Sequence, residues 1–318
     1  GWTHTIVTWR AGVVGSGSTA GNQLELHMTK SFVDVLGTQM AYVEAGVPDG
    51  PAVVFLHGNP TSSFLWREVW PAVADTCRVI APDLIGMGDS AKLNDAGPGS
   101  YRFVDHARYL DALLELVVPD GPVVLVIHDW GSALGFHWAN RHRDRVAGIA
   151  YMEAVVRPVE WDEWPQEARG IFEALRSEAG ESLVLDKNLF VENILPASVM
   201  GTMSEEVMAE YRRPFANPGE DRRPTLTWPR EIPLGGEPKD VVELVGAYAD
   251  WLASDTEVPK LFVNAEPGMI LTGPQRDFVR TWRNQREVTV PGLHFIQEDS
   301  GPQIGAAVRA WLDEVVLA

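Results

Sequence analysis

Short apolar runs that alternate with amphipathic stretches constrain the fold of this chain more than any other feature of its sequence. From Ser31 to the C-terminus, β-branched runs recur, and most are followed by a stretch with helical periodicity. This order predicts βαβ units, and therefore a mostly parallel sheet with helices on both faces. The first two runs have no helix between them and are expected to be antiparallel. Eight strands are predicted, at Phe32–Leu36, Gln39–Glu44, Val53–His57, Arg78–Pro82, Val123–His128, Val146–Glu153, Lys260–Ala265 and Glu287–Val290.

Helical periodicity is clearest in five stretches of the same region. These predicted helices are Tyr101–Val117, Ser132–Arg141, Asp240–Ala253, Pro274–Trp282 and Pro302–Val316. The segment 155–229 has no strand-like run but carries large aromatic residues among many charges, namely Trp161, Trp164, Phe172, Phe190, Phe215 and Trp228. We interpret 155–229 as a helical cap inserted after the sixth strand, and 31–154 with 230–318 as the core. Such an insertion would cover the carboxyl ends of the strands, where parallel sheets bind ligands, and would also stabilise the core by packing.

The N-terminal segment differs in composition from the rest of the chain. Residues 1–30 are expected to form an extension, because as far as His27 they are rich in Gly, Ser and Thr and show weak periodicity. With a single Arg, Arg10, and no apolar central run, the segment does not match a secretory signal. Met28 is a candidate native start. We expect a cytoplasmic protein.

The balance of charge excludes several classes of partner. Lys and Arg number 26 and Asp and Glu number 44, which gives a formal net charge of −18. A surface this acidic repels phosphate backbones and anionic lipid, so neither nucleic acid nor a membrane surface is expected as a partner, whereas a neutral organic substrate is unaffected. Because Cys77 is the only cysteine, an intramolecular disulfide and metal sites built from paired thiols are excluded.

The most informative motif is a predicted strand that runs into a predicted helix through one tight turn, at 123–132. In the nucleophile elbow of the α/β-hydrolase fold, such a turn exposes the central side chain above the sheet and points the next backbone N–H into the site. Asp129 takes the central position, which is usually Ser, and His128 takes the place of the usual first Gly. Gly131 allows close approach at the turn. Since Asp is also a preferred helix N-cap, this segment alone leaves both roles open for Asp129.

Other loops complete a catalytic pattern. The loop 57–60 follows a predicted strand where this fold provides an oxyanion-hole N–H, although its Gly-Asn-Pro sequence is also an ordinary turn. His294 follows the last predicted strand, and the chain order nucleophile, acid, histidine is that of the α/β hydrolases. The acid has two candidates, Glu153 and Glu266, each at the carboxyl end of a predicted strand, and the pattern does not separate them. We therefore predict an α/β-hydrolase fold with an eight-stranded, mostly parallel sheet and a helical cap.

These motifs resemble the haloalkane dehalogenases, in the subfamily whose acid is a Glu after the sixth strand. The resemblance extends from about Ser31 to the C-terminus, and its motifs recur in order along the chain. The matching segments are HGNPTSS at 57–63, DLIGMGDS at 83–90, HDWGSALG at 128–135, MEA at 152–154, WPREIP at 228–233 and HFIQED at 294–299.

The resemblance implies a role for each candidate residue. Asp129 would be the nucleophile, His294 the base and Glu153 the acid that orients the base. Asn59 and Trp130 would bind the halide and form the oxyanion hole. The implied substrate is a small halogenated hydrocarbon, with water as the second reactant and alcohol, halide ion and a proton as products. Neither a metal nor an organic cofactor is expected.

The chemistry explains why such groups are needed. A carboxylate attacks an alkyl carbon by in-line displacement and leaves an ester, which water must then cleave. A histidine can deprotonate that water if it is neutral and if a carboxylate orients its other nitrogen. The leaving halide develops charge in a dry pocket and needs fixed donors, each worth about 3 kcal/mol.

Other functions share part of this pattern. A serine esterase is excluded by Asp129, and an epoxide hydrolase would need two cap tyrosines, of which only Tyr211 clearly lies in 155–229. A coelenterazine-type luciferase has the same five site residues and the motif WDEWP, found here at 161–165, but Pro60 favours the dehalogenase. A non-catalytic ligand receptor on this scaffold often lacks part of the catalytic set, which is complete here.

Overall fold

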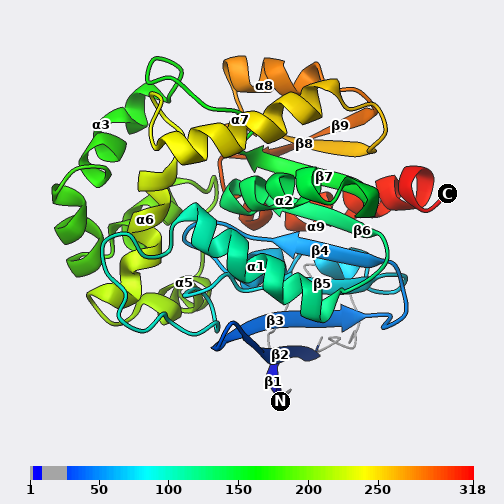
Figure 1. The fold of residues 1–318 in the computed structure, drawn as a ribbon, viewed down its shortest axis with the longest axis horizontal. Helices are drawn as coiled ribbons and strands as arrows, with labels where there is room; N and C mark the ends of the chain where they lie inside the picture. Colours follow the sequence, from blue (N-terminus) through cyan, green and yellow to red (C-terminus); the bar gives the residue numbers. More distant parts are fainter. Residues whose placement is uncertain (1–2, 9–26) are drawn as a thin grey trace, which may run out of the picture.

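A computed structural model describes residues 3–8 and 27–318 of the chain. Within these residues, nine strands form one sheet in the order β1-β2-β3-β5-β4-β6-β7-β8-β9 (Figure 1). The strands are β1 (Thr3–Thr8), β2 (His27–Val35), β3 (Thr38–Gly46), β4 (Ala52–Leu56), β5 (Arg78–Pro82), β6 (Val123–His128), β7 (Val146–Ala154), β8 (Lys260–Pro267) and β9 (Gln285–Gly292). From β1 to β5 the neighbours are antiparallel, and from β5 to β9 they are parallel. The predicted mostly parallel sheet is confirmed.

All eight predicted strands are present, as β2 to β9, and β1 is an additional strand inside the predicted extension 1–30. It pairs antiparallel with β2, while residues 1–2 and 9–26 of that extension lie outside the described residues. The predicted strand Phe32–Leu36 ends early, at Val35. Leu36 and Gly37 have φ angles of 54° and 78° and form the two-residue turn of the β2–β3 hairpin, for which both angles must be positive.

The five predicted helices are also present, as α1 (Phe103–Val117), α2 (Asp129–Arg141), α7 (Lys239–Ser254), α8 (Gly273–Arg280) and α9 (Ile296–Trp311). Helix α1 does not begin at Tyr101, because the φ of 62° at that residue is incompatible with a right-handed helix. Helix α9 begins before the predicted Pro302, and the non-helical backbone of Ser300 separates its first turn from the rest. Across residues 3–8 and 27–318, every helix is too short or too polar to span a membrane.

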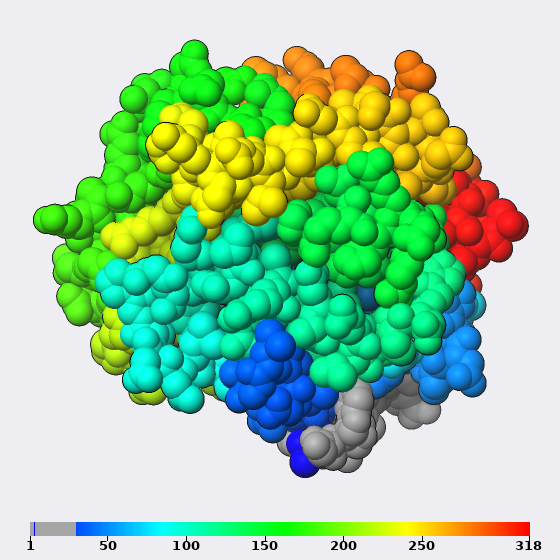
Figure 2. All heavy atoms as spheres, viewed as in Figure 1, coloured from blue at the N-terminus to red at the C-terminus, as the bar shows by residue number. Residues whose placement is uncertain are grey.

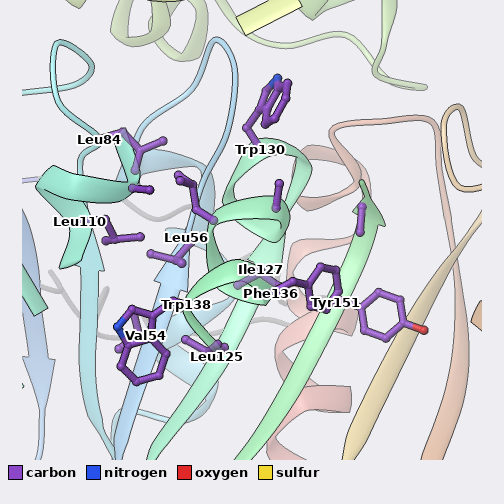
Figure 3. Close-up of a cluster of buried hydrophobic side chains, with 14 of the residues drawn as sticks. Val54, Leu56, Leu84, Leu110, Leu125, Ile127, Trp130, Phe136, Trp138 and Tyr151 are labelled. Carbon is purple, nitrogen blue, oxygen red and sulfur yellow. The ribbon is translucent and has the colours of Figure 1, made fainter. Parts of the chain in front are cut away.

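The parallel strands are buried on both faces, which explains their continuous apolar runs. In β4, Val54 and Leu56 face one apolar cluster and Val53 and Phe55 face the other, because successive side chains point to opposite faces. Figure 3 shows the first of these clusters between the strands and α2. Helices α1, α2 and α7 cover this face of the sheet (Figure 2), whereas α9 packs on the opposite face through residues such as Val308.

The segment between β7 and α7 is helical, and no strand occurs among its residues, all of which the structure describes. Its α-helices are α3 (Gln166–Leu175), α4 (Leu195–Ala197), α5 (Glu205–Arg212) and α6 (Arg223–Glu231). These helices lie beyond the ends to which the arrows of β4 and β7 point (Figure 1). Residues including Leu175, Phe190 and Leu226 form a separate small apolar cluster within the segment. The segment therefore lies over the carboxyl ends of the parallel strands.

Candidate active site

Asp129 lies in the sharp turn between β6 and α2. Its φ of 49° is in the left-handed region that residues other than Gly rarely adopt, as expected for the strained turn of a nucleophile elbow. Its carboxylate accepts a hydrogen bond from the Asn59 backbone N–H at 2.8 Å and lies 3.1 Å from His294 Nε2. Helix α2 has no side-chain cap. The carboxylate is thus directed to the loop and the histidine and not to the N–H groups of its own helix.

Two glycines allow the elbow and the loop after β4 to approach one another. A Cβ atom on Gly131 would lie 2.2 Å from the carbonyl oxygen of Leu56, and one on Gly58 would lie 2.2 Å from Asp129 Oδ2. No larger residue fits at either position without displacing backbone or the carboxylate. This close approach places the Asn59 N–H directly on the Asp129 carboxylate.

His294 lies in the loop between β9 and α9, with a carboxylate at each ring nitrogen. Its Nε2 is 3.1 Å from Asp129 Oδ1, and its Nδ1 is 3.0 Å from Glu153 Oε2. The backbone is held as well, because the His294 N–H donates to Ser198 O at 3.1 Å and the His294 carbonyl accepts from His128 Nε2 at 2.8 Å. The ring position is therefore determined from both the side-chain and the main-chain side.

The two candidate acids occupy very different environments. Glu153, at the end of β7, is 1% exposed, and its carboxylate accepts backbone N–H bonds of 3.2, 2.9 and 3.3 Å from residues 269–271 in addition to its contact with His294. The Glu266 side chain is 63% exposed and lies 3.6 Å from Arg276. The structure brings Glu153 to the histidine and leaves Glu266 at the surface. The donors at 269–271 were not predicted, because main-chain groups leave no side-chain signal in a sequence.

Burial and pairing act in opposite directions on the two central groups. Burial alone would raise the pKa of Asp129, but the hydrogen bond and charge of His294 hold that pKa below its usual value. Burial would lower the pKa of His294, but its hydrogen bonds to Asp129 and Glu153 raise that pKa to about 9. At neutral pH, His294 is therefore protonated and the Asp129 carboxylate beside it is ionised.

Asn59 and Trp130 line, together with Asp129 and His294, a cavity of about 110 Å³. The remaining wall is mostly apolar and comes from both the core and the segment 155–229, with Val155, Phe172, Phe190, Pro229, Ile232 and Ile270 among its members. Asn59 and Trp130 are 3% and 2% exposed, so both polar side chains are almost fully buried at the cavity wall. Among the described residues, no cluster of His, Cys, Asp and Glu is placed to hold a metal ion.

Comparison with known proteins places this chain in a family. The model of a family described as alpha/beta hydrolase fold matches residues 51–300. A haloalkane dehalogenase from Sphingobium indicum is 56% identical over 283 residues, which are 89% of this chain and 95% of that protein. The chain belongs to the haloalkane dehalogenase family.

Further members of the haloalkane dehalogenase family agree in sequence and in structure. The haloalkane dehalogenase of Mycolicibacterium smegmatis is 53% identical over 286 residues, covering 89% of this chain and 91% of that protein. A crystal structure of a haloalkane dehalogenase from Bradyrhizobium elkani is 43% identical and matches with a TM-score of 0.85 over 90% of this chain and 98% of that one. The predicted α/β-hydrolase fold and the family resemblance are both confirmed.

Proposed function

We propose that this haloalkane dehalogenase cleaves the carbon–halogen bond of a small haloalkane through an alkyl ester on Asp129, giving alcohol, halide and a proton. Membership of the family makes the chain a hydrolase that acts on carbon–halogen bonds. One observation carries the mechanism: the ring of His294 lies between the carboxylates of Asp129 and Glu153, 3.1 and 3.0 Å away, at the wall of an apolar cavity.

In the first step, Asp129 displaces the halide. The Asn59 N–H holds Oδ2, so Oδ1 attacks the carbon while the carbon–halogen bond breaks and its electron pair leaves with the halide. The halide develops negative charge beside the Asn59 amide and the Trp130 indole. These neutral N–H donors stabilise that charge in a dry cavity, where each interaction is stronger than in water.

In the second step, water cleaves the ester. Esterification removes the charge of Asp129, which is one of the two carboxylates that raise the pKa of His294, so this pKa falls below 9 and the ring releases its proton to solvent. Neutral His294 then takes a proton from water as the oxygen attacks the Asp129 carboxyl carbon. The N–H groups of Asn59 and Trp130 receive the oxyanion, and Glu153 orients the ring and stabilises the imidazolium. As the intermediate collapses, the carbon–oxygen bond to the alkoxide breaks and the second proton of the attacking water passes to the alkoxide, which releases the alcohol, restores the Asp129 carboxylate and leaves His294 protonated.

The proposed organisation of the chain supports this substrate class. Residues 155–229 act as a cap that contributes Phe172, Phe190 and Pro229 to the cavity, on a core formed by 31–154 and 230–318, with 1–30 as an extension. A cavity of about 110 Å³ with a mostly apolar wall suits a small neutral halogenated hydrocarbon, water and the released halide. The net charge of −18 disfavours nucleic acid and membrane surfaces as partners. A cytoplasmic location stays a prediction from the sequence.

The alternative functions have less support. An epoxide hydrolase would need tyrosine hydroxyls in the cavity, but Tyr211 is buried elsewhere and donates its hydroxyl to Glu298. Neither a luciferase nor a ligand receptor is favoured by the comparisons, in which haloalkane dehalogenases match over about nine-tenths of the chain.

Isotope transfer in a single turnover tests the proposal. With enzyme in excess over 1-bromobutane in ¹⁸O-labelled water, the ester mechanism delivers an Asp129 oxygen to the alcohol, so the first butanol formed is unlabelled and the label enters Asp129. Direct attack of water on the substrate would instead label the alcohol at once and contradict the proposal. Asp129→Ala is the matched control and should release no bromide. Light emission with coelenterazine, without halide release from any haloalkane, would favour the luciferase.

A further inference from the structure

Helix α6 contacts both side chains that are proposed to bind the halide. The carbonyl of Thr225 accepts a hydrogen bond from Asn59 Nδ2 at 3.3 Å. One turn further along the helix, the Trp228 ring stacks on Trp130 with centroids 4.5 Å apart and an interplanar angle of 21°. Asn59 comes from the loop after β4 and Trp130 from the first turn of α2, so α6 contacts two side chains that the core holds on different elements.

The contact with Thr225 determines how the Asn59 amide is turned. An amide nitrogen carries two hydrogens, and the Thr225 carbonyl accepts one of them, which leaves the second for the cavity that Asn59 lines. If the Asn59 amide were turned by 180°, its Oδ1 would face the carbonyl oxygen of Thr225, and the two oxygens would repel each other. The backbone of α6 therefore selects the orientation in which Asn59 acts as a donor toward the cavity.

The contact with Trp228 determines the plane of the Trp130 ring, and so the direction of its N–H. Trp228 is fully buried, and on its other side His106 of α1 stacks at 4.2 Å with an angle of 17°. Phe103 packs against Trp130 at 5.9 Å and 47°. Stacked aromatic rings attract each other beyond the area they bury, and a ring held in this way resists tilting.

The stack of three rings carries no charge. Burial lowers the pKa of His106 to about 3, so its imidazole is neutral at the pH at which the enzyme would work. The stack therefore orients Trp130 without adding a cation that would retain the halide after reaction.

Helix α6 is itself fixed to the core before any substrate binds. The Glu231 carboxylate accepts hydrogen bonds of 2.9 Å from the Phe103 N–H and from Arg102 Nε at the start of α1. The Thr227 hydroxyl donates to Ser100 O at 2.8 Å. The position of Trp228 is thus set by the junction of α6 with α1 and does not depend on contacts with a substrate.

We propose that Trp228 is a positioning residue for the halide site, and that His106 supports it from behind. Trp228 acts through Trp130, so it affects the step in which the carbon–halogen bond breaks and the affinity for halide. It does not affect hydrolysis of the ester, for which the backbone N–H groups and His294 are responsible. This inference rests on the proposed halide-binding roles of Asn59 and Trp130.

The experiment compares Trp228→Phe, Trp228→Leu and His106→Leu with the control Trp138→Leu. Trp138 lies on α2, like Trp130, and stacks on His142 at 4.4 Å and 18°, but it is at the opposite end of the cluster from Trp130 (Figure 3). For each variant, rapid-quench kinetics with 1-bromobutane separates the rate of bromide release in the burst from the rate of ester hydrolysis. The inhibition constant for added bromide and the melting temperature are measured in parallel.

We expect Trp228→Leu to slow the bromide burst and to weaken bromide inhibition by about threefold to tenfold, which corresponds to the loss of one stacking contact. Trp228→Phe and His106→Leu should have smaller effects of the same kind, and ester hydrolysis should stay within twofold in all variants. Trp138→Leu should lower the melting temperature without changing either halide readout. Trp228→Phe keeps an aromatic ring, so it can be used to test the inference if Trp228→Leu does not fold.

Two results would overturn the inference in distinguishable ways. If Trp130→Phe weakens bromide inhibition but the folded Trp228 variants do not, the halide pair stands and Trp228 only supports the fold. If the Trp228 variants slow the bromide burst and ester hydrolysis by the same factor, the conclusion is the same. If Trp130→Phe itself leaves bromide inhibition unchanged, the proposed halide pair fails, and the role of Trp228 fails with it.

Discussion

Glu153 and His294 are 141 residues apart in the chain, yet Glu153 Oε2 and His294 Nδ1 lie within 3.0 Å. The same carboxylate accepts N–H bonds from residues 269–271, so it is held in place whether or not the histidine is present. A carboxylate fixed in this way can determine the ring orientation and the proton position of His294. Several consequences of this geometry can be measured.

Exchange of the two candidate acids for their amides tests which carboxylate orients the base. Glu153→Gln should lower kcat by about 10⁴-fold, because an amide favours the wrong tautomer of the histidine and cannot stabilise its cation. Glu266→Gln, with a side chain that is 63% exposed, is the matched control and should stay within twofold of the wild type. A large loss of kcat in Glu266→Gln alone would show that Glu266, at the end of β8, orients the base.

Replacement of the base should stop the reaction at the ester. In His294→Phe, Asp129 loses the charge of His294 but keeps the Asn59 N–H, which favours its ionised form, so it can still be alkylated. Water, by contrast, is a poor nucleophile without a base. After exposure to 1-bromobutane, intact-mass spectrometry should show one added butyl group, which peptide mapping locates on Asp129, and one equivalent of bromide should appear in a burst without a steady phase. An adduct on a different carboxylate would overturn the assignment of Asp129. The absence of both the adduct and the bromide burst would show that His294 acts before the carbon–halogen bond breaks.

Loss of either halide donor should slow cleavage of the carbon–halogen bond and not hydrolysis of the ester. Asn59→Ala and Trp130→Phe each remove a side-chain donor and keep the backbone N–H, so bond cleavage should slow by about 100- to 1,000-fold while ester hydrolysis changes little. Trp138→Phe removes an indole N–H on the same helix, away from the cavity, and should have no effect. Rapid-quench kinetics reports both steps, and unchanged bromide release in both variants would exclude a halide-binding pair.

The two steps should also differ in their response to pH. The pKa of Asp129 is below its usual value, so the nucleophile is ionised and bond cleavage should be flat between about pH 5 and 9. Hydrolysis needs neutral His294, whose pKa of about 9 falls once the Asp129 charge is lost. Below that lowered pKa, hydrolysis should slow by about tenfold per pH unit. Burst and steady-state rates measured over this range provide the check, and a hydrolysis rate that is independent of pH would show that His294 is not the base.

Much of the fold could be predicted because its signals are local. Alternation of apolar runs and helical patterns depends only on neighbouring residues, and all eight predicted strands and five helices occur. Predictions failed where the backbone departs from what the residue type indicates. Leu36 has no turn preference but adopts a φ of 54° in the hairpin. The predicted helix Pro302–Val316 left out the first turn of α9, which precedes the non-helical backbone of Ser300.

The sequence by itself determined the α/β architecture and the turn between a strand and a helix at Asp129, because both follow from the order of residues along a short stretch of chain. It left the acid open between Glu153 and Glu266, which end the adjacent parallel strands β7 and β8. Only the tertiary structure decided which carboxylate meets His294, since this depends on the loop 269–271 that binds Glu153. The same holds for the contacts of Asn59 and Trp130 with α6, because Thr225 and Trp228 come from a distant part of the chain.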